Sequence, residues 1–351
     1  ATSNYNDADG GAGITVQGFA DFLGGDVGDT FTVNVATTVN LTGGTNNDLF
    51  NVNAVLNGSI AGGANPDDTD TLQGTQIATV ALTGLDLNGA DGAANSVLGG
   101  FGDIEIINAD AGTAGTTLTG LNNDTSLWQL NGTNAVYSIT GGTVATTNFD
   151  NLSGNAAGGV DTFAVLTAST FNLLGAAGAD VFGLADQLTG SISGGAGIDL
   201  IAFLSGLGAV NGTVDGGANG ATLNYAANGG TAITVTLTAA GGTIGFNGNV
   251  GNIGGGFSNI TSLVGSTAQD TLNGTVLGNA TWSLNGNSDY TNGVATINFS
   301  DFESLVGGSG NDTFNVNAGF TVSPSLSATL DGGAAGDDVF NVNAAFDGSI
   351  L

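Results

Sequence analysis

GGSGNDTFNVNA, residues 307–318, is a glycine turn followed by one aspartate and an alternating apolar and polar run. Side chains two residues apart lie on the same face of a β-strand. Phe314, Val316 and Ala318 therefore share one face, and the asparagines between them share the other. This alternation predicts a short strand with one buried face, entered through a glycine turn.

The same unit returns along the chain at residues 24–31, 43–50, 158–163, 175–182, 194–201 and 332–340. Its aspartates are 19 residues apart between Asp29 and Asp48, and again between Asp161, Asp180 and Asp199. The intervals widen to 22 residues from position 48 to 70 and to 26 from position 312 to 338. Self-similarity at a nearly fixed period is the sequence signature of a repeat architecture.

A second short strand often follows the first within one repeat, as at residues 57–60 and 190–193. Helical periodicity is not convincing anywhere, and glycine recurs too often for long helices. We therefore expect an all-β fold, a parallel β-helix or β-solenoid whose coils of about 19–22 residues stack about 4.8 Å apart.

A longer repeat overlies the short one. Trp128 leads through Phe149 to Asp161, as Trp282 leads through Phe302 to Asp312. We expect one continuous array over residues 1–351, with repeat cassettes at about 1–60, 61–220 and 221–351. Both chain ends fall inside a repeat, and terminal coils normally need caps, which predicts a segment of a longer array or a filament subunit.

The composition indicates a folded chain with an unusual charge. Sixty-four glycines accompany only 2 prolines, yet 41% hydrophobic residues and 18 phenylalanines predict a buried core. Thirty acidic residues face no Lys, Arg or His, which gives a formal charge of −30. Two carboxylates about 5 Å apart repel by about 3 kcal/mol at an effective dielectric constant of 20. An ordered column of stacked aspartates would thus favour a bound cation.

The absence of basic residues and cysteine excludes several classes of function. Nucleic-acid binding and attraction to anionic lipid both need positive charge, which these side chains lack. Without cysteine there is no disulfide, thiolate metal site or thiol redox chemistry. No apolar run reaches 18 residues, so no membrane-inserted helix is predicted. A nucleophilic triad lacks its histidine base, and we expect no enzyme.

GGAGID at residues 194–199 and GGSGND at residues 307–312 match the turn of the hemolysin-type calcium-binding repeat. The chain thus resembles RTX proteins, whose stacked turns form a β-roll. The resemblance implies that glycine carbonyls and aspartate carboxylates ligate calcium, an ion that accepts six to eight oxygens. The implied metal residues are Asp161, Asp180, Asp199, Gly178, Gly197, Asp29, Asp48, Asp312 and Asp338.

The resemblance also implies that the apolar residue two positions after each aspartate points into the core, namely Phe31, Phe50, Phe163, Phe182, Ile201, Phe314 and Phe340. The chain departs from the family because it has one recognisable turn per coil, and because residues 175–180 read GAAGAD. A second interpretation needs no metal: aspartate and asparagine tolerate tight turns and cap them locally. Both interpretations stay open at this point.

The longer repeat resembles the glycine- and asparagine-rich strand repeats of bacterial surface proteins, including filamentous-hemagglutinin-like adhesins. This resemblance implies a secreted protein of the cell surface. It would form a filament, adhesin stalk, biofilm-matrix or surface-layer element, associate end to end, and have calcium as an optional stiffener.

The alternative is a β-helix that binds or processes surface polysaccharide. Paired carboxylates can hydrolyse glycosides, and Asp67, Asp68 and Asp70 form the densest acidic group. Their place beside Pro66 predicts a solvated turn instead. Two tryptophans, at positions 128 and 282, could stack on sugars, but equivalent positions in two repeats are typical of core packing.

Overall fold

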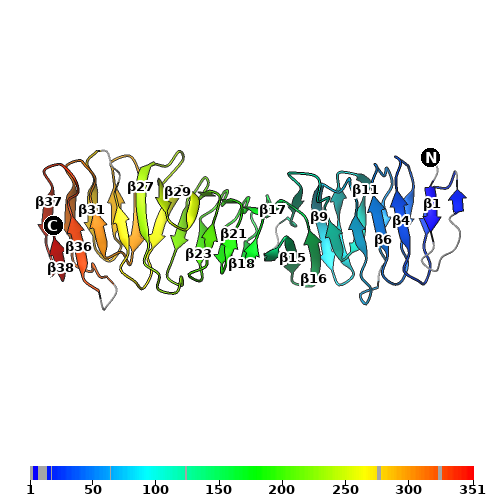
Figure 1. Cartoon of the computed structure of the whole chain (residues 1–351), viewed down its shortest axis with the longest axis horizontal. Coiled ribbons are helices and arrows are strands. Elements are labelled where there is room, and N and C mark those ends of the chain that lie inside the picture. Colours follow the sequence, from blue (N-terminus) through cyan, green and yellow to red (C-terminus); the bar gives the residue numbers. More distant parts are fainter. Residues whose placement is uncertain are drawn as a thin grey trace. The chain divides into compact units, whose positions relative to one another are not determined.

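The computed structural model describes residues 3–6, 14–16, 18–63, 65–122, 125–274, 278–322 and 326–351, and its regular elements within these ranges are all strands. The predicted all-β class is confirmed. Parts of the predicted opening repeat, residues 1–2, 7–13 and 17, lie outside the described residues. The chain divides into two compact units, Ala1–Phe163 with Ser169–Leu173, and Ala164–Ala168 with Leu174–Leu351 (Figure 1).

The strands of the first unit, together with β18 at the junction, are β1 (Ser3–Asn6), β2 (Ile14–Val16), β3 (Asp21–Leu23), β4 (Thr30–Val33), β5 (Asn40–Thr42), β6 (Leu49–Val52), β7 (Ile60–Ala61), β8 (Thr71–Gln73), β9 (Thr79–Asp86), β10 (Gly89–Ala94), β11 (Val97–Ile104), β12 (Ile106–Asn108), β13 (Thr117–Thr119), β14 (Ser126–Gly132), β15 (Asn134–Ile139), β16 (Gly142–Thr147), β17 (Asn151–Ser153), β18 (Asp161–Ser169) and β19 (Asn172–Leu174).

The strands of the second unit are β20 (Val181–Leu184), β21 (Gln187–Leu188), β22 (Ile192–Ser193), β23 (Asp199–Phe203), β24 (Ala209–Val210), β25 (Val214–Asp215), β26 (Ala221–Asn224), β27 (Thr234–Ala240), β28 (Phe246–Val250), β29 (Ile253–Val264), β30 (Thr271–Asn273), β31 (Thr281–Leu284), β32 (Asp289–Thr291), β33 (Thr296–Ser300), β34 (Ser304–Val306), β35 (Thr313–Val316), β36 (Ala328–Asp331), β37 (Val339–Val342) and β38 (Gly348–Ile350).

The strands that follow the glycine turns pair in parallel, with the spacing of the sequence repeat as their register. In the first unit β4 pairs with β6 and β6 with β8, which places Phe31 beside Phe50 and Phe50 beside Leu72. In the second unit β35 pairs with β37, which places Phe314 beside Phe340. Each aspartate-to-aspartate interval is therefore the length of chain between two neighbouring strands of a parallel ladder.

The inward face of these ladders is a column of apolar side chains. Strands β4, β6 and β35 alternate buried and partly buried residues, as the sequence alternation predicts. The rings of Phe31 and Phe50 stack with centroids 5.2 Å apart. The other predicted core residues are buried too, except for the partly buried Phe340; the buried ones are Phe163, Phe182, Ile201 and Phe314.

Antiparallel strands, which the sequence alternation alone does not predict, interrupt the parallel ladders. In the first unit β14, β15 and β16 form an antiparallel meander, after which β16 pairs in parallel with β12. The β14–β15 turn contains Gly132 at φ 68°, in the left-handed region that favours glycine. Strands β31, β32 and β33 repeat the meander in the second unit. The longer sequence repeat is thus a meander inserted between parallel strands.

The outward face of the ladders carries amide side chains that bond from strand to strand. Asn53 Nδ2 donates to Asn34 Oδ1 at 3.0 Å, and Gln73 Nε2 donates to Asn51 Oδ1 at 2.7 Å. In the second unit Asn341 repeats this bond to Asn315 at 2.8 Å. Such ladders satisfy polar groups without charge, since each amide both donates and accepts.

Candidate functional site

Some turn aspartates accept an amide of their own glycine turn, whereas Asp48 Oδ2 and Asp199 Oδ2 accept no hydrogen bond among the described residues. Asp29 Oδ2 accepts a hydrogen bond from the Gly25 amide at 2.7 Å, and Asp312 Oδ2 accepts one from the Gly308 amide at 2.6 Å. Both carboxylates are buried, with 1% and 0% of their residues exposed. A buried carboxylate must be compensated, and here the backbone supplies the donors.

A carboxylate oxygen of several turn aspartates also reaches the neighbouring turn. Asp48 Oδ1 accepts the Asp29 amide at 2.6 Å, Asp199 Oδ1 accepts the Asp180 amide at 2.9 Å, and Asp338 Oδ1 accepts the Asp312 amide at 2.8 Å. Each bond joins two aspartates that are one repeat apart. The aspartate column is therefore a ladder of carboxylates and backbone amides, with the like charges separated by donors.

The first glycine of the turn is required by close approach rather than by its backbone angle. A Cβ placed on Gly43 would overlap Asp48 Oδ2 and press on the Gly62 carbonyl oxygen. The same obstruction by a turn aspartate meets a Cβ at Gly194 and at Gly307. The aspartate carboxylate occupies the space that a side chain on the glycine would need. This explains why the glycine and the aspartate occur together.

The structure places the predicted metal residues of the turns in this ladder. The aspartates are buried, apart from the partly buried Asp338. Gly178 and Gly197 adopt φ of 128° and 130°, and the Gly178 amide donates to the Ala196 carbonyl at 2.8 Å. Asp161 accepts the Asn155 amide at 3.0 Å and the Ser126 hydroxyl. Calcium at these residues stays a prediction, beside a structural role for their carboxylates.

Burial perturbs the acidity of several turn aspartates. Removal from water raises the pKa of Asp48 to about 6, and it also raises the pKa of Asp161, Asp199 and Asp312 above the ordinary value of 3.8. Hydrogen bonds to backbone amides oppose the shift at each of these residues.

The two glutamates of the chain occupy equivalent places in the ladder. Glu105 Oε2 accepts the Asp70 amide at 2.5 Å, and Glu303 Oε2 accepts the Asp270 amide at 2.9 Å. Asp103 and Asp301, two residues before each glutamate, adopt φ of 55° and 58°. Where an antiparallel insertion separates two turns, the longer glutamate side chain therefore accepts the aspartate amide, as an aspartate side chain does between simple repeats.

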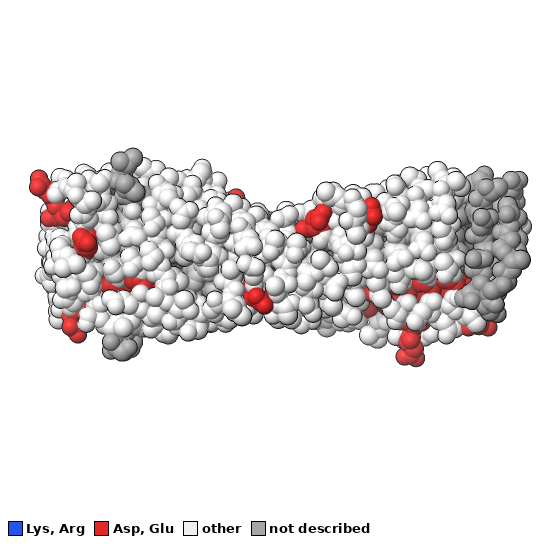
Figure 2. Space-filling model, in the orientation of Figure 1, with Lys and Arg blue, Asp and Glu red and all other residues white. Residues whose placement is uncertain are grey.

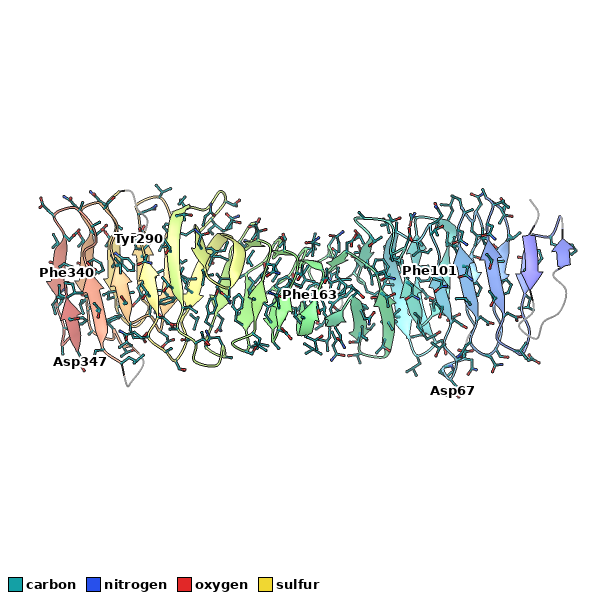
Figure 3. All side chains as sticks on the ribbon, in the orientation of Figure 1. Asp67, Phe101, Phe163, Tyr290, Phe340 and Asp347 are labelled. Carbon is teal, nitrogen blue, oxygen red and sulfur yellow. The ribbon has the colours of Figure 1, made fainter. Side chains whose placement is uncertain are left out.

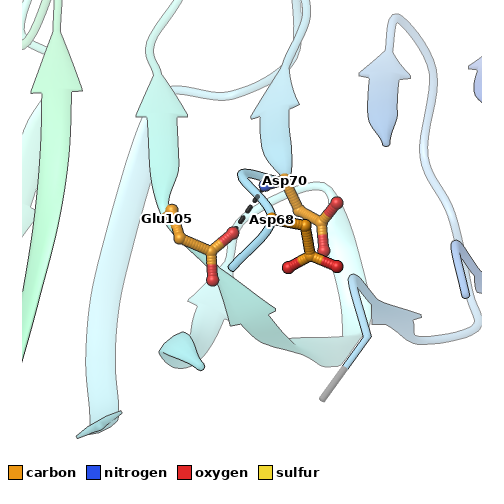
Figure 4. A group of neighbouring side chains, drawn as sticks. All are labelled: Asp68, Asp70 and Glu105. Carbon is orange, nitrogen blue, oxygen red and sulfur yellow. Dashed lines mark hydrogen bonds between the residues drawn. The ribbon is translucent and has the colours of Figure 1, made fainter. Parts of the chain in front are cut away.

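One carboxylate joins the first of these pairs and creates the most concentrated acidic site. Ligand oxygens of Asp68, Asp70 and Glu105 lie within 4.8 Å of one another (Figure 4). The predicted solvated turn is wrong for Asp68, which is 7% exposed, and for Asp70, which is 0% exposed. Only Asp67 of the three predicted turn residues points into solvent, on a loop that projects from the strands (Figure 3).

Four oxygens of this cluster accept no hydrogen bond of good geometry among the described residues: Asp68 Oδ1, Asp68 Oδ2, Asp70 Oδ2 and Glu105 Oε1. The Asn65 side chain and the Asn46 backbone make only weaker contacts with the Asp68 carboxylate. Burial, with repulsion between neighbouring carboxylates as a smaller cause, raises the pKa of Asp70 to about 7 and that of Glu105 to about 7. Burial also raises the pKa of Asp68. The cluster thus concentrates four such oxygens, whereas Asp48 and Asp199 each have one.

Sequence reasoning missed this cluster because Glu105 lies 35 residues after Asp70. The sequence signal for these glutamates is the similarity between DIE at residues 103–105 and DFE at residues 301–303, which contain the only two glutamates of the chain. Both follow a turn aspartate by a similar interval, 35 and 33 residues.

The tryptophans lie in the core. Trp128 is 0% exposed and stacks on Phe163 with centroids 5.5 Å apart, and Trp282 is 0% exposed and stacks on Phe314 at 5.3 Å. A buried ring cannot stack on a sugar. The core-packing interpretation of these two residues is confirmed.

The visible surface carries no positive group and scattered negative ones. On the face drawn in Figure 2, carboxylates form isolated patches and a short row in each unit.

No family model, curated protein or solved structure matches the chain. Within the described ranges, no helix is both long and apolar enough to span a membrane.

Proposed function

We propose that this chain is a β-solenoid structural element of the bacterial exterior, built for length and self-association rather than for catalysis. The observation that carries the proposal is the repeated link between neighbouring turns. At Asp48, Asp199 and Asp338 alike, one carboxylate oxygen accepts the amide of the aspartate one repeat earlier. A link that recurs between neighbouring turns supports an array, whereas an active site would single out one repeat.

The polar surface supports the same proposal. Amides that bond from strand to strand, such as Asn53 to Asn34 and Asn341 to Asn315, extend the ladder outside the core. Filament, adhesin stalk, biofilm-matrix and surface-layer roles all use such a surface, and they share a secreted location. The polysaccharide alternative loses its aromatic platform, because Trp128 and Trp282 are buried.

Self-association would use the edge formed by β37 and β38. Strand β37 pairs with β35 and β38 pairs with β36, and no described strand pairs with their other edge. Val339, Val342 and Ile350 are 43–47% exposed there. An uncovered strand edge with apolar side chains is a template for another strand. We propose that a second copy of this chain adds its strands here.

The Asp338 amide points to the same conclusion. In each preceding pair the aspartate amide donates to the carboxylate of the next turn, as the Asp312 amide does to Asp338. The Asp338 amide has no acceptor among the described residues. A further turn with the same motif would supply that acceptor.

The test is a proline on the open edge. In β37 the amides of Val339 and Asn343 donate to β35 and its flank, so the alternating amide of Val342 faces away. Val342→Pro removes this outward donor, and Val342→Ile keeps it with an apolar side chain. We expect sedimentation velocity and electron microscopy to show assemblies of the parent chain and of Val342→Ile that Val342→Pro lacks. Monomers of all three proteins at high concentration would overturn the proposal.

A further inference from the structure

The carboxylates of Asp68, Asp70 and Glu105 form a cluster of negative charge, and the chain has no Lys, Arg or His to balance it. We propose that this cluster binds one hard divalent cation, with calcium as the best fit. The site lies within the first unit and does not depend on self-association. It is also distinct from the turn positions that the RTX resemblance implies.

The strongest observation is the side chain of Asp68. It is more than nine-tenths buried, and neither of its carboxylate oxygens accepts a hydrogen bond of good geometry among the described residues, with only weaker contacts from the Asn65 side chain and the Asn46 backbone. Figure 4 shows this carboxylate beside that of Asp70 and facing Glu105. Burying an ionised carboxylate without partners is costly unless a metal or a positive charge compensates it. With no Lys, Arg or His in the chain, a bound metal is the remaining positive partner.

The occupied oxygens hold the open ones in place. Asp70 Oδ1 accepts the Asp48 amide at 2.7 Å, and Glu105 Oε2 accepts the Asp70 amide at 2.5 Å. Each bond fixes one oxygen of its carboxylate and leaves the other, Asp70 Oδ2 or Glu105 Oε1, for a ligand. Pre-oriented oxygens reduce the ordering cost of metal binding.

The spacing suits calcium. Calcium binds oxygens at about 2.3–2.6 Å, so opposite ligands of one ion lie about 5 Å apart. The ligand oxygens of the three residues lie within 4.8 Å of one another, inside that limit. Calcium accepts irregular sets of six to eight oxygens, and water completes such a set, whereas magnesium requires a near-ideal octahedron. We therefore expect calcium to bind more tightly than magnesium.

The second unit contains a natural control for this site. Asp270 and Glu303 make the same amide-to-carboxylate bond as Asp70 and Glu105, at 2.9 Å. Ala268 stands two residues before Asp270, where the first unit has Asp68. Asp270 Oδ2 there accepts the Ser266 amide. In the second unit, the pair Asp270 and Glu303 therefore has a backbone donor for the second oxygen of Asp270, and it has no third carboxylate beside it. The ladder bond forms without a residue like Asp68, which supports a role for Asp68 as a metal ligand.

The experiment is calcium titration of the metal-stripped full chain by isothermal calorimetry at neutral pH, with magnesium as the competing ion. Asp68→Ala copies the second unit, and Asp67→Ala changes the same charge on the exposed neighbour. We expect Asp68→Ala to bind one calcium fewer per chain than the parent and Asp67→Ala. Glu105→Gln should weaken the same site by at least about tenfold, since affinity follows the number of charged ligands.

Melting temperature gives a second readout, because a ligand that binds only the folded state raises it. Calcium should raise the melting temperature of the parent and of Asp67→Ala by an increment that Asp68→Ala lacks. Equal calcium counts and affinities for the parent and Asp68→Ala would overturn the proposal. So would a parent chain that binds no calcium at neutral pH, which would leave protonation as the way in which the cluster loses its charge.

Discussion

At the scale of the residue, the turn aspartate Asp312 is a two-sided acceptor. Its Oδ2 accepts the Gly308 amide and its Oδ1 accepts the Ala280 amide, whereas Asp48 and Asp199 make only the bond to the neighbouring turn. The sequence analysis predicted the position and burial of the unit but left its role open between calcium ligand and turn cap. The role depends on which donors lie one repeat away, and that information is not contained in the local motif.

Removal of the Asp312 carboxylate should therefore leave two buried amides without a hydrogen-bond acceptor. We expect Asp312→Ala to lower the free energy of unfolding by about 2–5 kcal/mol, since each unsatisfied buried donor costs about 1–3 kcal/mol. Asp312→Asn keeps one acceptor and should lose less. Denaturant titration would measure both, with the exposed Asp337→Ala as control, for which we expect a change below about 0.5 kcal/mol. A loss of stability no greater than that of the control would contradict the two-sided role.

The paired glycine offers a complementary test. A Cβ at Gly43 overlaps Asp48 Oδ2, whereas a Cβ at Gly25 meets nothing within 4 Å. We expect Gly43→Ala to destabilise the chain by about 1–3 kcal/mol, the usual cost of overpacking, and Gly25→Ala to have a much smaller effect. Thermal unfolding followed by circular dichroism would compare them. Equal effects would mean that the glycine is not making room for the carboxylate.

At the scale of the element, the short parallel strands follow from the alternation and the near-constant spacing of the aspartates. The antiparallel meanders did not follow, because β14 to β16 show the same period-two alternation as a parallel strand. What distinguishes them is the turn NGTN at residues 131–134, a hairpin signal. The acidic cluster was missed for a related reason: β9, β10 and β11 intervene between Asp70 and Glu105, and local sequence does not reveal that they are brought together.

The meanders carry the tryptophans, and their burial is directly measurable. Trp128 packs edge-on against Tyr137 with centroids 4.5 Å apart, and Trp282 packs against Tyr290 at 4.6 Å. We expect blue-shifted tryptophan fluorescence that iodide quenches weakly in the folded chain and strongly after unfolding. Trp282→Phe leaves Trp128 as the only emitter, so each unit can be followed alone. Strong quenching in the folded state would contradict the buried meander.

At the scale of the whole molecule, the formal charge of −30 is stabilised without a single basic side chain. Hydrogen bonds from backbone amides favour the charged form of the buried carboxylates and burial disfavours it, and the balance of the two sets the dependence of stability on pH. Because burial raises the pKa of Asp161, Asp199 and Asp312 above 3.8, the folded state holds protons that the unfolded state releases.

The sign of the pH effect follows from that balance. The contribution of these groups is fully present below pH 3.8 and is lost as the pH rises through their raised pKa values. In the presence of a chelator, we expect the free energy of unfolding to fall as the pH rises from about 4 to neutrality. Asp199→Asn should reduce the slope. Stability that rises over this range would show that the hydrogen bonds outweigh burial.

We propose that the glycine-aspartate turns of each unit stack as coils of a β-solenoid. Electron cryo-microscopy of the purified chain, with calcium and with chelator, tests it most directly. We predict elongated particles in which successive strands recur about every 4.8 Å along the long axis. Particles whose strands form two face-to-face sheets, with no such axial repeat, would contradict the account.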